Sequence, residues 1–140
     1  MGINLKGAFY TARAVMEDMK DRNWGRIVFL GSMVSFVSIP GRAAYASSKT
    51  AILGLTRTLA LETASNDICV NAICPGVFQT HMNSIWMKDT VKRQAFLEKI
   101  PKERFGDPED LDALIVYLCS PGCAYMTGAD LVIDGGWIIQ

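Results

Sequence analysis

Tyr45 and Lys49 are the pair of residues whose types and spacing most directly suggest chemistry in this sequence. They stand at positions i and i+4, so in a helix their side chains share one face and the ammonium group can lie beside the phenol. A free phenol has a pKa of about 10, and a neighbouring cation favours the phenolate and brings this pKa toward the neutral range, where proton transfer is most effective. Ser32, upstream of the pair, can hydrogen-bond a substrate oxygen. These three residues predict an acid–base site.

The residues around Ser32 indicate how such a site would be positioned. Residues 26–31 read Arg-Ile-Val-Phe-Leu-Gly, a short apolar run that is typical of a buried parallel strand. Ser32 would then stand at the carboxyl end of a strand, where open α/β sheets bind their ligands. Tyr45 and Lys49 would begin a helix over about 44–64. Alone, the pair is a weak motif and could be an ordinary surface pair on a solvated helix, but the order of strand, serine and helix favours a functional site.

The remaining sequence alternates between predicted helices and strands. In chain order, we predict a helix over about 5–19, a strand over 68–73 ended by Pro75-Gly76, short helices before Gly106 that cover a pocket, a helix that begins at Asp107-Pro108, and a strand over 131–133. Because helices and strands alternate, the sequence predicts an α/β fold of about three parallel strands with flanking helices.

The composition suits one compact domain. The chain has 140 residues, of which 50% are hydrophobic, enough to bury one core. Its 14 basic and 14 acidic residues give a formal charge of zero, so we expect no nucleic-acid or anionic-membrane partner. The sequence contains neither an apolar run of about 18 residues nor a basic leader, and we therefore expect no membrane span and no signal peptide.

The cysteines do not suggest a metal site. Cys69, Cys74, Cys119 and Cys123 have spacings that differ from those of metal-binding motifs, and His81 is the one histidine in the sequence. Cys69 lies within a predicted strand and Cys119 closes a predicted helix, where free cysteine behaves as a small hydrophobe. We interpret all four as structural thiols in a reducing cytoplasm, with no metal, and His81 as a loop residue.

One feature expected of a dinucleotide-binding sheet is absent from the sequence. Such a sheet begins with a strand, a Gly-rich turn and a helix, and residues 1–140 contain no turn of this kind. The sequence therefore predicts that residues 1–140 form a partial domain, namely the carboxyl-terminal portion of a Rossmann-like, doubly wound parallel sheet whose Gly-rich half is absent. Alone, the chain should bind a dinucleotide weakly or not at all, because the pyrophosphate lacks a helix N-terminus to bind.

From its first residues to its last, the chain resembles the second half of a short-chain dehydrogenase/reductase. The matching segments are Asn4–Gly7, Gly31–Met33, Tyr45–Lys49, Val70–Ala72, Pro75–Thr80, Arg104–Glu109, Thr127–Gly128 and Asp134–Gly136. The catalytic residues of this family are an Asn-Ser-Tyr-Lys tetrad, and the resemblance places it at Asn4, Ser32, Tyr45 and Lys49.

The resemblance also implies a role for each member of the tetrad. Tyr45 would give or take the proton of a carbonyl or secondary alcohol, while hydride passes to or from the nicotinamide of NAD or NADP. Lys49 would lower the pKa of Tyr45 and hold the nicotinamide ribose. Ser32 would orient the substrate oxygen, and Asn4 would connect Lys49 to water. Without the other three, Asn4 could equally be a polar residue near a helix start.

Further cofactor contacts are implied at the end of the second predicted strand. Pro75 and Gly76 would bring backbone to the nicotinamide, and Phe78 and Thr80 match positions that contact the carboxamide or the phosphates. The alternative for Pro75-Gly76 is an ordinary turn that ends a strand. Because the Gly-rich half is absent, we expect the chain alone to be inactive and its full-length parent to be an active enzyme.

The resemblance narrows the substrate to two candidates. Met33–Phe36 and Gly135–Trp137 resemble family members that oxidise sugar acids such as gluconate or 2-deoxygluconate, which is the interpretation we favour. The alternative is a 3-oxoacyl-carrier-protein reductase, for which Lys88, Lys92 and Arg93 form only a modest docking cluster for an acidic partner. Members of the family commonly assemble, often as tetramers, through the helices that match the first two here. A non-catalytic assembly module is therefore a further alternative.

Overall fold

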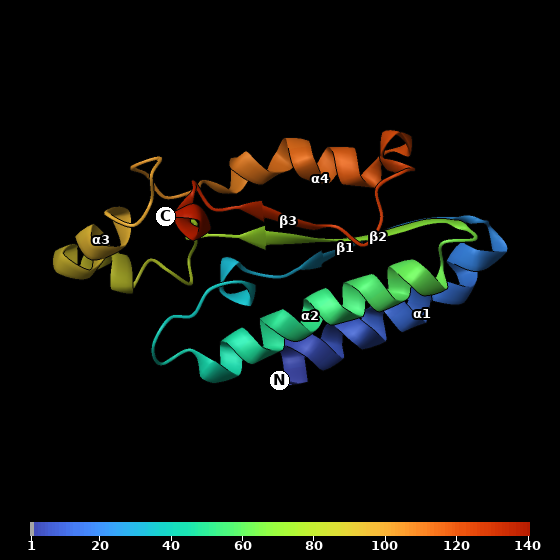
Figure 1. Cartoon of the computed structure of the whole chain (residues 1–140), viewed down its shortest axis with the longest axis horizontal. Helices are drawn as coiled ribbons and strands as arrows, with labels where there is room; N and C mark the ends of the chain where they lie inside the picture. The colour runs from blue at the N-terminus through green and yellow to red at the C-terminus, as the bar shows by residue number, and fades with distance from the viewer. Residues whose placement is uncertain (1) are drawn as a thin grey trace.

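The structure is a computed structural model that describes residues 2–140. It contains a three-stranded parallel sheet with helices on both faces (Figure 1). The strands are β1 (Trp24–Leu30), β2 (Asp67–Pro75) and β3 (Asp130–Ile133), in that spatial order. The helices are α1 (Ala8–Asp21), α2 (Ala43–Glu62), α3 (Thr90–Leu97) and α4 (Asp112–Cys119). This arrangement confirms the predicted α/β fold of three parallel strands with flanking helices.

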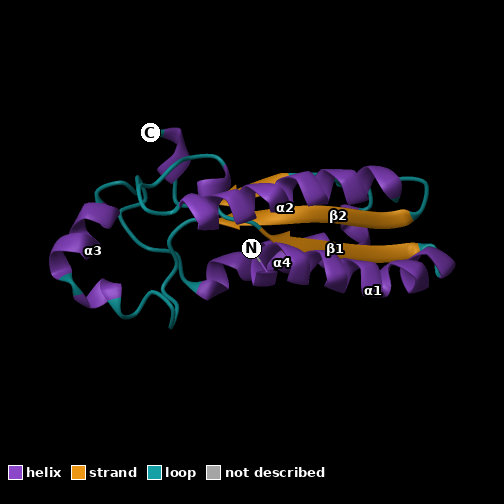
Figure 2. Ribbon diagram, turned by 90° about the horizontal axis from the view of Figure 1, so that it is seen from below, coloured by secondary structure: helices purple, strands orange, loops and turns teal. Residues whose placement is uncertain are grey.

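The helices are divided between the two faces of the sheet. In Figure 1, α1 and α2 run side by side below the sheet and α4 lies above it. Figure 2, seen from the side of α1 and α2, shows α1 along β1 and α2 along β2. The short helix α3 lies beyond the carboxyl ends of the strands (Figure 1). Within residues 2–140, β1 pairs with β2 alone, so its other edge carries no strand.

The strand register brings the carboxyl ends of the strands together. Leu30 of β1 is opposite Ile73 of β2, and Pro75 of β2 is opposite Ile133 of β3. Beyond these pairs, the backbone N–H of Gly31 donates to the Ile73 carbonyl at 2.8 Å, and that of Gly76 donates to the Ile133 carbonyl at 2.8 Å. The segments that follow β1 and β2 therefore start at the same edge of the sheet.

The core lies on both faces of β2, because this strand is covered by α1 and α2 on one side and by α4 on the other. Its residues 68–74 are all buried, which explains why all of them except Asn71 are apolar. On the α2 side, the buried residues recur at helical spacing: Ser48, Ile52, Leu53, Thr56 and Ala60. Burial of this stripe against β2 fixes the direction in which the first turn of α2 points.

Two helix starts differ in detail from the sequence prediction. The first helix is preceded by a π-helical segment, Gly2–Gly7, and α1 begins only at Ala8. The predicted start at Asp107-Pro108 is confirmed, but its first turn, Pro108–Leu111, is 3₁₀-helical and α4 follows from Asp112. A 3₁₀ first turn is common at helix N-termini, and proline is tolerated there because the N–H that it lacks would have no intrahelical partner.

Capping by Asp110 stabilises this turn. Its carboxylate accepts the backbone N–H of Asp107 at 2.9 Å and a two-point contact from Arg104 at 2.7 and 2.8 Å. Hydrogen bonding from Arg104, followed by that from the Asp107 backbone, lowers the pKa of Asp110 to about 2. The turn thereby connects α4 to the segment that contains α3.

Candidate active site

Tyr45 and Lys49 lie together in the first turns of α2, as their spacing predicts. Lys49 Nζ is 5.8 Å from the centroid of the Tyr45 ring. The same Nζ donates a hydrogen bond of 2.7 Å to the backbone carbonyl of Leu30, the last residue of β1. The Tyr45 side chain remains 39% exposed. The ammonium group thus connects the start of α2 to the end of β1 and leaves the phenol accessible from outside.

Burial shifts the ionisation of Lys49. Desolvation lowers the pKa of its ammonium group below the ordinary value, and the charge interaction with Cys74 opposes this shift only in part. The bond to the Leu30 carbonyl satisfies one of the three donors of the ammonium group. Two further N–H groups are therefore available to a bound molecule.

Ser32 follows β1 in extended backbone geometry and is 8% exposed. It caps the 3₁₀ turn Met33–Ser35, and its Oγ accepts the backbone N–H of Val34 at 3.4 Å. Because the hydroxyl acts as the acceptor in this bond, its proton can still be donated to another oxygen. Ser32 comes two residues after the carbonyl that binds Lys49, so both groups are anchored on one short segment.

The side chain of Asn4 contacts a residue that the sequence analysis did not consider. Asn4 Nδ2 donates to Ser48 Oγ at 3.1 Å, and Ser48 Oγ donates to the backbone carbonyl of Tyr45 at 2.7 Å. Ser48 is 1% exposed. Asn4 is thereby linked to the first turn of α2. A polar residue within the buried stripe of α2 was the available signal for Ser48.

Pro75 and Gly76 lie where β2 ends, at the same edge of the sheet as Ser32. A Cβ added to Gly76 would come within 2.7 Å of both Cα and Cβ of Asp134. Glycine at this position therefore allows close contact between the end of β2 and the turn after β3. This packing explains the glycine without reference to a ligand.

Phe78 and Thr80 differ in accessibility. The Phe78 ring is 7% exposed, and a Cβ on Gly106 would approach it within 2.7 Å. The Thr80 side chain is exposed, and its carbonyl accepts the backbone N–H groups of Asn83 and Ser84, both at 3.0 Å. Of the two residues, Thr80 offers its side chain to a ligand at this edge.

The segment between β2 and α4 contains the predicted short helices, namely the 3₁₀ turn Trp86–Lys88 and α3. Its aromatic rings pack together and against the C-terminal Trp137, with centroid distances of 4.8 Å for Trp86 and Phe96 and 5.5 Å for Phe96 and Trp137. Met33 and Val34, which follow Ser32, belong to the same cluster. The covering segment and the loop after Ser32 therefore share one core.

One hollow of about 390 Å³ lies beside the start of α2. It is lined by residues 34–38 and by Ala46, Ser47, Thr50 and Ala51. Neither Tyr45 nor Lys49 lines this hollow. The hollow is therefore separate from the acid–base pair.

The cysteines are free thiols, but they do not share one environment. Cys69, Cys74 and Cys123 are buried, as expected of small apolar residues. Cys119 is exposed at the last position of α4, so the expectation that it behaves as a small hydrophobe was wrong. Helical periodicity turned this position away from the sheet.

His81 lies in an exposed turn, as predicted. In residues 2–140, no cluster of potential ligands could hold a metal ion, and no helix has the length and apolar character needed to cross a membrane.

Comparison with known proteins identifies relatives over the whole chain. Residues 1–138 match the family model described as "Enoyl-(Acyl carrier protein) reductase". The chain is 37% identical to human "Dehydrogenase/reductase SDR family member 4" over 97% of this chain and 49% of the relative. It is 34% identical to the 3-oxoacyl-[acyl-carrier-protein] reductase FabG of Aquifex aeolicus over 96% of this chain and 53% of that relative. The chain thus spans about half the length of the curated relatives it matches.

Solved structures of related proteins share the fold of this chain over nearly its whole length. A "putative short-chain alcohol dehydrogenase" from Sinorhizobium meliloti 1021 is 45% identical with a TM-score of 0.92, covering 98% of this chain and 54% of that one. A "putative NAD(P) dependent gluconate 5-dehydrogenase" from Beutenbergia cavernae, solved with NADP, is 37% identical with a TM-score of 0.95, covering 99% of this chain and 55% of that one.

Proposed function

The chain belongs to the short-chain dehydrogenase/reductase family, and we propose on this basis that the whole protein is an NAD(P)-dependent oxidoreductase that interconverts a secondary alcohol and a ketone. The observation that carries the proposal is the position of Lys49 Nζ, 5.8 Å from the Tyr45 ring and bound to the end of β1. This arrangement gives an accessible phenol a fixed cationic neighbour at the sheet edge where α/β proteins bind ligands.

In the proposed reaction, the Tyr45 hydroxyl donates its proton to the ketone oxygen, or its phenolate takes the proton of the alcohol. The ammonium group of Lys49 stabilises the negative charge on the phenol oxygen while the proton is away. The Ser32 hydroxyl donates a hydrogen bond to the substrate oxygen and holds it near Tyr45. When bound, NAD or NADP accepts or supplies the hydride.

The residues present fit the nicotinamide half of this cofactor. The two unused donors of Lys49 can bind ribose hydroxyls, and the exposed Thr80 hydroxyl lies beyond the end of β2. Pro75, Gly76 and the backbone of Phe78 follow along the same edge. Within this chain, no Gly-rich turn offers its backbone to the pyrophosphate.

We therefore expect the 140-residue chain to bind dinucleotides only weakly. Titration of NADH and NADPH fluorescence should show a Kd well above that of a fused chain in which residues 2–140 follow the amino-terminal part of the Sinorhizobium meliloti relative. The physical reason is that contacts to the nicotinamide half alone must offset the full entropy cost of binding. Tight binding by the isolated chain would contradict this expectation. The Lys49→Gln variant is the control, because specific binding should weaken when the ammonium donors of Lys49 are lost.

For the substrate, we propose a sugar acid. The description of the Beutenbergia cavernae relative names gluconate, at 37% identity. The cationic cluster that a carrier protein would need is partly engaged, because Lys92 pairs with Asp89 at 3.3 Å and Arg93 lies 5.5 Å from the centre of the Phe105 ring. The similarity to FabG keeps 3-oxoacyl-carrier-protein reduction as the alternative.

The test uses a fused chain, in which residues 2–140 follow the amino-terminal part of the Sinorhizobium meliloti relative that this chain does not cover. Turnover of gluconate or 2-deoxygluconate with NAD or NADP would support the proposal. Turnover of acyl thioesters alone would favour the reductase alternative. A fused chain that folds and binds cofactor but converts neither class would contradict the proposed substrates.

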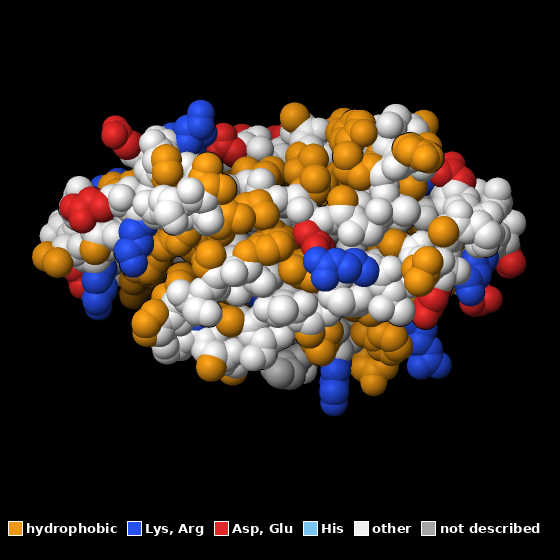
Figure 3. Space-filling view, in the orientation of Figure 1, with side chains coloured by type: hydrophobic (Ala, Val, Ile, Leu, Met, Phe, Trp, Pro, Cys, Tyr) orange, Lys and Arg blue, Asp and Glu red, His pale blue; other side chains and the backbone are white. Residues whose placement is uncertain are grey.

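We also propose that the protein associates with a second copy through α1 and α2, and that it acts in the cytoplasm. Phe9 is 42% exposed and Tyr10 57% exposed on α1, and their rings contact each other with centroids 5.6 Å apart. Figure 3 shows hydrophobic side chains on the lower side of the molecule, where α1 and α2 lie. Such exposed apolar groups favour a protein interface.

Replacing Tyr10 by glutamate should abolish this association, because pairing would bury its charge without a partner. Sedimentation velocity of the fused chain should then show a shift to a smaller assembly. Tyr125→Glu is the control, because Tyr125 is fully exposed after α4, on the opposite side of the sheet. An equal effect of both substitutions, or of neither, would count against the α1–α2 interface.

A further inference from the structure

The segment between β2 and α4 begins and ends beside Phe78. Phe78 forms an isolated parallel bridge with Gly106. In this bridge, the backbone N–H of Gln79 donates to the Gly106 carbonyl at 2.7 Å, and that of Gly106 donates to the Val77 carbonyl at 2.9 Å. Residues 80–103, which we call the cover, therefore form a loop that is closed at its base where β2 ends.

Asn83 links the first turn of the cover to this base. Its Nδ2 donates to the backbone carbonyl of Phe78 at 2.8 Å, and its Oδ1 accepts the indole N–H of Trp86 at 3.0 Å. A backbone carbonyl can only accept and an indole nitrogen can only donate, so these two partners fix the orientation of the Asn83 amide. One short side chain thus joins the end of β2 to an aromatic ring of the cover.

Trp86 extends this link to the loop after β1. Its ring meets the Phe105 ring edge to face, with the centroids 6.0 Å apart. Trp86 packs against the core cluster that contains Phe105, Met33 and Val34, and the last two belong to the turn that follows β1. Asn83 therefore connects the end of β2 with the cluster that supports the neighbouring loop of the candidate active site.

We propose that Asn83 is a positioning residue: its two side-chain hydrogen bonds hold the cover on the end of β2, and thereby place Thr80 and the Phe78 backbone for binding of the nicotinamide half of the cofactor. Thr80 lies in the same turn, because its carbonyl accepts the backbone N–H of Asn83 at 3.0 Å. The effect on the cofactor rests on the proposed function, whereas the link between the cover and β2 does not.

Three substitutions separate the two bonds of Asn83. Asn83→Asp keeps an acceptor for the Trp86 indole but has no donor for the Phe78 carbonyl. Trp86→Phe keeps an aromatic ring and the bond to Phe78, but it lacks the indole N–H. Asn83→Leu removes both bonds at similar size. If Asn83 only favours a local turn, aspartate should serve as well as asparagine, because both residues suit turns.

Ser84→Ala is the matched control in the same turn. Ser84 Oγ donates to the His81 carbonyl at 2.7 Å, in an exposed bond within the cover. Alanine removes this bond without touching the contacts of Asn83 with Phe78 and Trp86. The control therefore weakens the turn locally and leaves the link to β2 intact.

The first measurement is hydrogen exchange by NMR in the 140-residue chain, whose three tryptophans give separate indole signals. We expect Asn83→Leu to accelerate exchange of the Trp86 indole and of the Gln79 and Gly106 amides about 3- to 10-fold, the effect of losing one hydrogen bond. Asn83→Asp should accelerate only the two amides, and Ser84→Ala none of the three. Native exchange at all three groups in Asn83→Leu, or equal acceleration by Ser84→Ala, would overturn the proposal.

The second measurement is the steady-state kinetics of the fused chain. Asn83→Asp should raise the KM for the cofactor about tenfold and change kcat less than about threefold, because Ser32, Tyr45 and Lys49 lie on other segments. An unchanged KM, or a fall in kcat as large as the rise in KM, would overturn the positioning role. If the exchange results are as expected but the native fused chain shows no turnover, the proposed function fails while the link between the cover and β2 stands.

Discussion

Replacing Tyr45 by phenylalanine in the fused chain should lower kcat about 10²- to 10⁴-fold, the usual contribution of a positioned general acid or base. The substitution removes one hydroxyl and keeps the ring beside Lys49. Because the side chain is 39% exposed, the change leaves no buried polar group without a partner. The fold, measured by circular dichroism and thermal unfolding, should therefore remain as in the native protein, while the steady-state rate falls.

Tyr125→Phe is the control for this experiment, because it makes the same chemical change on a fully exposed tyrosine after α4, outside the proposed α1–α2 interface. It should leave kcat within about twofold of the native value, as expected of a surface substitution. Normal turnover in the Tyr45→Phe variant would remove the phenol from the mechanism. That result would favour the alternative of a non-catalytic assembly module, in which the Tyr45 hydroxyl takes part in no reaction.

Loss of the positive charge on Lys49 should slow the same proton transfer by Tyr45, because of where the ammonium group lies. Its ammonium group is held by the Leu30 carbonyl at 2.7 Å, and it is the cation beside Tyr45. Because burial already lowers the pKa of Lys49, the charge on this group is lost at a lower pH than for a free lysine. The stabilisation that this charge gives to a phenolate should therefore weaken as the pH rises through that pKa.

The parts of the structure that follow from local spacing could be predicted from the sequence. Tyr45 and Lys49 are one helical turn apart, so their proximity depends only on α2 being a helix. β1 was recognised from its apolar run, and the position of Ser32 followed from where that run ends. The roles of Asn4, Ser32, Tyr45 and Lys49 in catalysis stay predictions, as do the cofactor contacts of residues 75–80.

The parts that depend on contacts between distant segments could not be predicted. Asn4 and Ser48 are 44 positions apart, and their hydrogen bond exists only because the π-helical segment Gly2–Gly7 packs against α2. Gly76 was interpreted as a residue that approaches a ligand, whereas its missing Cβ also makes room for Asp134, which follows β3. A periodic pattern shows which face of an element is buried, but it does not show which residue lies opposite.

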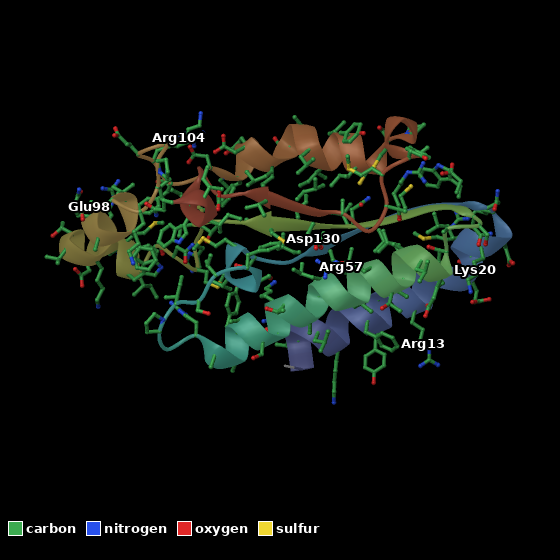
Figure 4. The ribbon with its side chains drawn as sticks, viewed as in Figure 1. Arg13, Lys20, Arg57, Glu98, Arg104 and Asp130 are labelled. Carbon is green, nitrogen blue, oxygen red and sulfur yellow. The ribbon has the colours of Figure 1, made fainter. Side chains whose placement is uncertain are left out.

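Ion pairs between distant segments could not be predicted from the sequence either. Arg57 of α2 pairs with Asp130 at the start of β3, and Figure 4 shows the two side chains meeting between the helix and the sheet. Nothing in the sequence around either residue indicates the other. Their contact follows from the placement of α2 along β2, the strand next to β3, which only the assembled fold determines.

Replacing Asn71 by leucine should give the largest loss of stability among the substitutions considered. Asn71 is 1% exposed in the middle of β2. Its Nδ2 donates to the Met126 carbonyl at 2.8 Å, and its Oδ1 accepts the backbone N–H of Ala129 at 3.0 Å. Leucine would leave both part-buried backbone groups without this partner, at a cost of up to about 1–3 kcal/mol each. Stability should therefore fall by up to about 2–6 kcal/mol, measured by urea unfolding.

Asn66→Ala is the control, because Asn66 forms an exposed side-chain hydrogen bond of 3.0 Å with Asn23 at the opposite end of the sheet from Ser32. Its loss should change stability by about 0.5 kcal/mol or less. A loss of similar size for Asn71→Leu would mean that the segment before β3 is held by other contacts. Those contacts are already identified: Thr127 Oγ1 accepts the Val70 N–H at 3.1 Å, and Gly128 N–H donates to the Val70 carbonyl at 2.7 Å.

The consequence of the Asn71 substitution should extend to the candidate active site. Asn71 positions the segment that enters β3, and β3 leads into the turn at Asp134 that packs against Gly76. Loosening β3 would therefore release the end of β2, where the proposed cofactor contacts lie. Hydrogen exchange should show loss of protection at the Gly76 amide, which donates to the Ile133 carbonyl, before loss at the Gly31 amide, which is held by β2 itself. Simultaneous loss at both amides would show instead that the sheet unfolds as one unit.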